Sequence, residues 1–112
     1  MFINNAASAR EWADSWIKYA AERRAWGRAL RMLQDTLDAQ HVCARSCRSR
    51  GQDATAEGHD AAAAELVRYI QHAQAAAEET AHAAARDQAA AEAEQEAMWT
   101  RLAQKRLGRN PR

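Results

Sequence analysis

The chain has 112 residues, 47% of them hydrophobic and 28% charged, and a formal net charge of +1 at pH 7. Alanine inflates the hydrophobic fraction and buries little area per residue, so the composition predicts one domain, residues 1–112, with a thin core. No apolar run approaches the ~18 residues that a membrane span needs, which excludes a transmembrane protein.

The N-terminal segment, Met1 to Asn5, has no charged stretch followed by an apolar core, so it predicts no signal peptide. Cys43 and Cys47 lie four residues apart and do not resemble the disulfide framework of a secreted protein. We therefore expect a cytoplasmic protein with no membrane partner.

The first predicted helix runs from about residue 9 to residue 48. Ser8 followed by Glu11 has the spacing of a capping box, which marks a helix start. Beyond it, apolar residues alternate by four and three positions, as in the seam of a coiled coil. The seam positions are Trp12, Trp16, Tyr19, Arg23, Trp26, Leu30, Leu33, Leu37, Gln40, Ala44 and Cys47.

A second long helix is predicted from about residue 60 to residue 107, after a turn at about 49–59. Gly51 suits the left-handed cap of the first helix. The second helix could begin at Asp53 or at Asp60, and Asp60 suits its N-cap. Residues 59–107 contain no proline or glycine, and 17 of the 37 residues from Ala61 to Ala97 are alanine. A basic tail, 108–112, follows.

A short turn makes neighbouring helices antiparallel. The predicted fold is therefore all-α: an antiparallel two-helix hairpin of long helices, completed by homodimerisation into a four-helix bundle. Large residues of the first helix would pack on the alanines of the second. Counting from the turn places Leu37 opposite Ile70, Trp26 opposite Thr80, and Trp12 near residues 94–99.

The tryptophans are the main functional signal. They would serve as core residues, but alanine neighbours cannot cover a whole indole, so we expect exposed aromatic area beside arginine, as in protein interfaces. The predicted function is a non-enzymatic protein–protein interaction module: an adaptor, cap or inhibitor that docks on a larger protein. The predicted partner-binding residues are Trp12, Trp16, Trp26, Trp99, Arg24, Arg28 and Arg31.

A nucleic-acid-binding accessory protein is the first alternative. Its phosphate contacts would come from two groups of basic residues. Arg24, Arg28 and Arg31 would form a ladder along one side of the first helix, at spacings of four and three residues. Arg101, Lys105, Arg106 and Arg109 follow one another with no acidic residue between them. Residues 53–97 weigh against this alternative, because they carry ten acidic and only two basic side chains and would repel phosphate.

A metal-binding helical bundle is the second alternative. Cys43 and Cys47 share a helix face near the turn, and the hairpin would bring His59 close to Cys47. Two thiolates and an imidazole suit zinc, although the spacing matches no strong zinc signature. The other interpretation treats both cysteines as small buried hydrophobes, and we expect no cofactor.

No pattern indicates catalysis. The serines, Ser8, Ser15, Ser46 and Ser49, have no glycine-rich elbow or evident histidine–acid pair around them. The chain also has no glycine-rich phosphate-binding loop. We therefore expect a protein that is not an enzyme.

Overall fold

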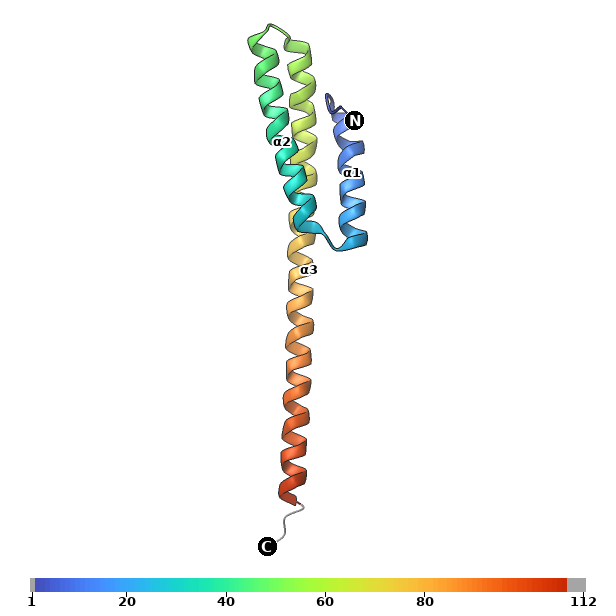
Figure 1. Ribbon diagram of the computed structural model, residues 1–112, viewed down its shortest axis with the longest axis vertical. Coiled ribbons are helices and arrows are strands. Elements are labelled where there is room, and N and C mark those ends of the chain that lie inside the picture. Colours follow the sequence, from blue (N-terminus) through green and yellow to red (C-terminus); the bar gives the residue numbers. More distant parts are fainter. Residues whose placement is uncertain (1, 109–112) are drawn as a thin grey trace. The chain divides into compact units, whose positions relative to one another are not determined.

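The computed structural model describes residues 2–108, which form three α-helices and no strands (Figure 1). The predicted all-α class is confirmed. The helices are α1 (Ala6–Arg23), α2 (Trp26–Ser49) and α3 (Asp53–Gly108).

The prediction of only two helices is wrong. The continuous helix expected over residues 9–48 is interrupted after Arg23, and the turn expected over 49–59 shortens to residues 50–52. The chain divides into two units, Met1–Ala77 and Glu78–Arg112, and each is described by itself.

The interruption between α1 and α2 is a left-handed helix cap at Arg24. This residue has φ 54° and ψ 38°, and the next amide, of Ala25, donates to the carbonyl of Ala20 at 3.0 Å. Such caps usually contain glycine, because a Cβ atom crowds the backbone in the left-handed region. The break was missed because an arginine stands where the sequence signal would be a glycine.

The turn between α2 and α3 uses the same geometry with the usual residue. Gly51 has φ 74°, and the amide of Gln52 donates to the carbonyl of Cys47 at 2.8 Å. The predicted role of Gly51 as the left-handed cap is therefore confirmed. Arg48 and Asp60 form an ion pair across this turn, and this contact lowers the pKa of the Asp60 carboxyl below its ordinary value.

Substitutions at these two caps should change the free energy of unfolding in opposite directions. Arg24→Gly should raise the free energy of unfolding by about 1 kcal/mol, because glycine adopts positive φ without the Cβ penalty. Gly51→Ala should lower it by about the same amount. Urea unfolding followed by circular dichroism measures both changes. If residues 9–48 formed one continuous helix, Arg24→Gly would instead be destabilising.

The start of α1 also differs from the prediction. The N-cap is Asn5, whose side-chain oxygen accepts from the amide of Ser8 at 2.7 Å, while the hydroxyl of Ser8 accepts from the amide of Asn5 at 3.2 Å. The capping box is thus formed by Asn5 and Ser8 rather than by Ser8 and Glu11. Asparagine is as good an N-cap as serine, so the helix begins three residues earlier.

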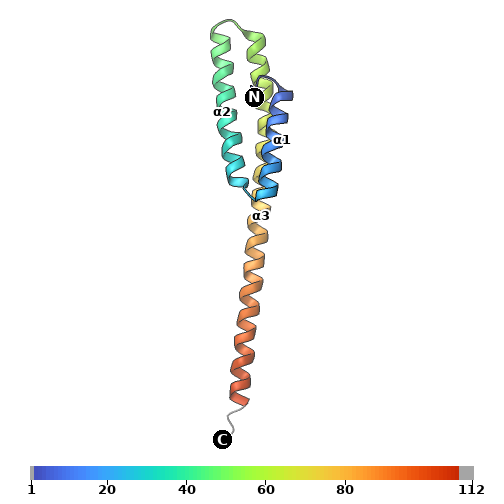
Figure 2. The same cartoon turned by 45° about the vertical axis from the view of Figure 1, so that its right-hand side comes forward.

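In the first unit, α1 and the N-terminal part of α3 run in the same direction and α2 runs opposite to both (Figures 1 and 2). One contact holds the N-terminal segment against α3, and another holds α1 against it. The rings of Phe2 and His59 are 6.2 Å apart, and the hydroxyl of Tyr69 donates to Asp14 at 2.5 Å. The hairpin of α2 and α3 therefore gains a third helix from the same chain.

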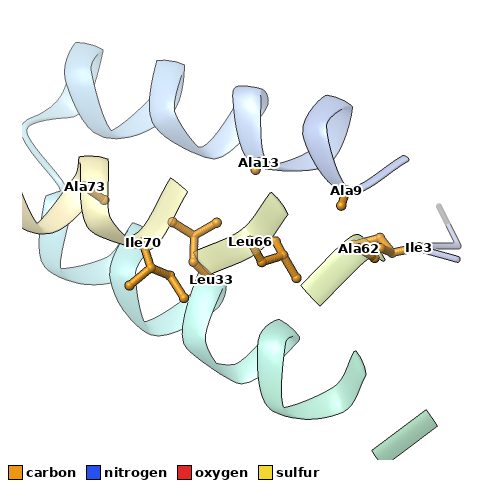
Figure 3. Packing of buried hydrophobic residues seen from close by; sticks show 8 residues of the cluster. All are labelled: Ile3, Ala9, Ala13, Leu33, Ala62, Leu66, Ile70 and Ala73. Carbon is orange, nitrogen blue, oxygen red and sulfur yellow. The ribbon is translucent and has the colours of Figure 1, made fainter. Parts of the chain in front are cut away.

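Small residues dominate the core of this unit (Figure 3). Leu33 and Leu66 are its largest fully buried side chains. The α2 seam is confirmed where Leu33, Ala44 and Cys47 are buried. The central cluster consists of Ile3, Ala9, Ala13, Leu33, Ala62, Leu66, Ile70 and Ala73, with Trp12, Ile17, Trp26, Leu30, Leu37 and Tyr69 partly buried against it.

The predicted pairing register is wrong for the tryptophans. The ring of Trp26 lies 6.4 Å from that of His72, about two helical turns before Thr80. Trp12 packs against the cluster that contains Leu66, not at the predicted position near residues 94–99. The reason is the reversal after α1, which returns Trp12 to the beginning of α3.

The N-terminal segment approaches the backbone of α3 at Gly58. A Cβ atom at this position would overlap the carbonyl oxygen of Asn4, whereas a Cβ atom at Gly27 would meet nothing within 4 Å. The adjacent Ile3 is buried in the core cluster. Gly58 is therefore required by the close packing of the N-terminal segment, although it lies inside a helix.

This difference gives a matched pair of substitutions. Gly58→Ala should lower the free energy of unfolding by about 1–3 kcal/mol, because the backbone of the N-terminal segment must move. Gly27→Ala should raise it by about 0.5 kcal/mol, through helix propensity alone. Thermal unfolding of both variants tests this, and a stabilising Gly58→Ala would show that Asn4 does not lie against α3.

Candidate protein-interaction surface

The C-terminal part of α3, from Glu78 to Gly108, is the most exposed part of the described chain. Every residue in it is exposed except Ala83, which is half-buried. Its helical conformation follows from its alanine content and from the absence of internal glycine and proline. Lys105 and Arg106 in the last turn oppose the negative end of the helix dipole.

Large apolar side chains are concentrated near the end of this segment. Trp99 is 60% exposed, Leu102 49% and Met98 43%. These three residues lie along one strip of the helix surface, because consecutive residues are rotated by about 100°. An exposed cluster of this kind is typical of a surface that binds another protein.

The same strip continues toward Glu78 as small and uncharged residues. Beyond Ala77 this strip is exposed rather than buried. Its members after Ala77 are Ala81, Ala84, Gln88, Ala91, Gln95, Trp99 and Leu102. The strip carries large side chains at one end and methyl groups at the other.

Charge is also divided along this segment. The acidic residues are Glu78, Glu79, Asp87, Glu92, Glu94 and Glu96, and the basic residues after them are Arg101, Lys105 and Arg106. Arg86 is a basic residue within the acidic stretch. The side-chain amide of Gln88 donates to the carboxylate of Glu92 at 3.1 Å, a contact along the helix.

Of the predicted anchors, only Trp99 is a highly exposed tryptophan. Trp12, Trp16 and Trp26 are half-buried, and Trp12 and Trp26 pack against the core cluster. Trp16 lies edge-on to Trp12 and Tyr19, with ring centroids 6.3 and 5.4 Å away. Trp12, Trp16 and Tyr19 therefore form an aromatic row along α1, and this row packs against the core of the first unit through Trp12.

The predicted arginine ladder is divided by the helix break. Arg24 is the left-handed cap after α1, while Arg28 and Arg31 lie on α2. All three side chains are exposed. The expected continuous ladder with four- and three-residue spacing on one helix is therefore wrong, because Arg24 no longer belongs to that helix.

A polar contact joins α1 to α3 beside a shallow hollow lined by Ile17, Glu65 and Arg68. The Tyr69 hydroxyl donates to the Asp14 carboxylate, and this bond raises the pKa of Tyr69 to about 12. Burial and the negative charges of Asp14 and Glu65 act in the same direction. The protonated phenol is thus the form that stabilises the packing of α1.

The stabilisation by Tyr69 should depend on pH in the alkaline range. Because its pKa is raised in the folded state, the stabilising effect is present below pH 10 and is lost as pH rises through about 12. Wild-type protein should lose about 1 kcal/mol relative to Tyr69→Phe over this range, since the group is partly exposed. Urea unfolding at several pH values measures the difference.

Tyr19→Phe is the matched control, because it removes a phenol hydroxyl without touching Asp14. This variant should follow the wild-type pH dependence. Identical pH dependence of wild type and Tyr69→Phe would contradict a stabilising bond to Asp14.

The predicted metal residues belong to the packed part of the first unit. Cys47 is buried, Cys43 is half-buried, and both are free thiols. His59 is buried, and its Nδ1–H donates to Oε1 of Gln40 at 2.6 Å. Within residues 2–108, no group of three or more histidine, cysteine, aspartate or glutamate side chains is placed to hold a metal ion.

The predicted nucleic-acid residues lie at the end of α3. Arg101, Lys105 and Arg106 are exposed there, and Arg109 is outside the described residues. Lys105 and Arg106 line a shallow hollow together with Trp99, Leu102 and Leu107, so the basic groups border the apolar cluster.

None of the helices in residues 2–108 has a stretch long and apolar enough to cross a membrane. Comparison of the chain with protein-family models, curated proteins and solved structures found no match.

Proposed function

We propose that the protein is a non-enzymatic protein–protein interaction module that binds its partner through residues 78–108 of α3. The observation that carries this proposal is the exposed cluster of Met98, Trp99 and Leu102 on a helix segment that buries none of its residues. Burying one such side chain contributes about 1.5–3 kcal/mol, so covering the cluster would favour association.

The shape of the segment suits a helical partner. The methyl groups of Ala81, Ala84 and Ala91 allow another helix axis to come close, while Trp99 supplies a large contact area. In the proposed role as an adaptor, cap or inhibitor, the first unit would serve as a folded body and the α3 segment as the docking element. The cytoplasm is the proposed location.

Self-association is part of the same proposal, but its geometry differs from the bundle predicted from sequence. Two bare hairpins would each need an open face on α2 and α3, and α1 packs against that hairpin. The exposed α3 segment is the better contact between copies. The half-buried row of Trp12, Trp16 and Tyr19 is a secondary candidate surface.

The test is the double substitution Trp99→Ala, Leu102→Ala, with Gln104→Ala on the opposite helix face as the matched control. The double variant should lose complex formation, by at least tenfold in affinity, because it removes the buried apolar anchors. Light scattering reports self-association, and affinity capture from the native cells compares the partners of the three proteins. Circular dichroism should show equal helicity.

Recovery of the same partners and the same oligomer with all three proteins would contradict the proposal. Loss of helicity in the double variant would also contradict it, because Trp99 would then be a structural residue. The nucleic-acid alternative predicts a different result: binding that weakens steeply with salt and does not depend on Trp99.

A further inference from the structure

We infer that residues 78–108 of α3 pair with the same segment of a second copy, antiparallel and end to end, so that Glu78 lies beside the partner's Gly108. The inference rests on the proposed function and names the partner and the orientation. The segment is roughly 45 Å long, or about four heptads, which is long enough for a stable two-helix contact.

Side-chain size favours this orientation. In an end-to-end antiparallel pair, core positions equally distant from Ala93 face one another. Leu102 then lies opposite the partner's Ala84, nine residues from Ala93 on the other side, while Trp99, at a position that flanks the core, lies beside the partner's Ala85. The bulky end of each strip thus meets the methyl-lined end of the other, so the two axes can stay at one separation along the whole segment.

Charge favours the same register. In an antiparallel pair, residues flanking the core on one side face the equivalent flank of the other helix. Asp87 then faces the partner's Arg101, and Glu78 faces the partner's Arg106. The two-fold axis repeats each of these attractive pairs, whereas Glu92 and Glu94 each meet the same residue of the partner only once. Pairs of opposite charge therefore outnumber pairs of like charge.

A parallel pair in register would reverse this balance. The flanking positions would bring Asp87 beside the partner's Glu92 and Arg101 beside the partner's Arg106, both of like charge and both repeated by symmetry. Large side chains would also gather at one end and alanines at the other, which would splay the axes. The arrangement of residues in the segment therefore selects the antiparallel pair.

Sliding the antiparallel pair by one heptad is also less favourable. Shifting toward Glu78 places Asp87 opposite the partner's Glu94 and removes both attractive pairs. Shifting toward Gly108 leaves the first heptad, with Ala81, without a partner. The end-to-end register keeps the full overlap and the ion pairs together.

Disulfide cross-linking of the full chain distinguishes the orientations, in a Cys43→Ser, Cys47→Ala background with helicity checked by circular dichroism. Glu92→Cys should give a covalent dimer on oxidation, because this position faces itself near the two-fold axis. Leu102→Cys should give no covalent dimer, since the two copies of this position would be about 27 Å apart. A parallel pair would give the opposite pattern.

Charge reversal gives an independent readout. At low salt, Arg101→Asp should weaken the dimer roughly fivefold, as measured by sedimentation equilibrium, and adding Asp87→Arg should restore it. In a parallel pair, Arg101→Asp would instead tighten the dimer, because the new carboxylate would face Arg106.

Covalent dimers from Leu102→Cys, tighter association of Arg101→Asp, or a wild-type monomer at all concentrations would each overturn the self-pairing. If the wild-type protein is monomeric but binds a different protein, and Trp99→Ala, Leu102→Ala abolishes that binding, the self-pairing is wrong and the proposed function stands. If Glu92→Cys gives the covalent dimer but the double substitution does not change the affinity of the non-covalent dimer, the proposed function of the apolar cluster is wrong.

Discussion

The reversal of the chain at Arg24 is the constraint on which the other features depend. Because α1 ends there in a left-handed cap, the chain reverses direction into α2. The helix α1 then lies alongside α3 and contributes Ala9 and Ala13 to the core. The buried residues of α3 then all lie between Ala56 and Ala73. The rest of α3 is left with its apolar strip exposed, and the proposed function rests on that strip.

Packing in the first unit depends on small side chains. Fully buried alanines on all three helices allow the axes to approach, and Leu33 and Leu66 are the largest side chains that are fully buried. Trp12 and Trp26 cover the edges of this core and are themselves half covered. A core of this kind is sensitive to close backbone contacts, as at Gly58, where a single methyl group has no room.

Parts of the fold could be predicted from local patterns. The seam of α2 and the buried face of α3 up to Ala73 follow the apolar spacing, and Gly51 marks the turn because glycine is the usual left-handed residue. The break at Arg24 could not be predicted, because the apolar spacing continues through it and arginine is a poor signal for a cap. The predicted position of Trp12 was wrong for the same reason.

The sequence by itself determined that the chain is helical, that α3 is long, and that Trp99 and Leu102 share a strip with alanines, because these properties depend on residues a few positions apart. The tertiary structure decided which parts of the two amphipathic patterns are buried. Local spacing reports that a face is apolar, but whether another helix covers it depends on where the chain turns. Here the chain turns at Arg24, a single residue with positive φ, and α1 therefore packs against the beginning of α3.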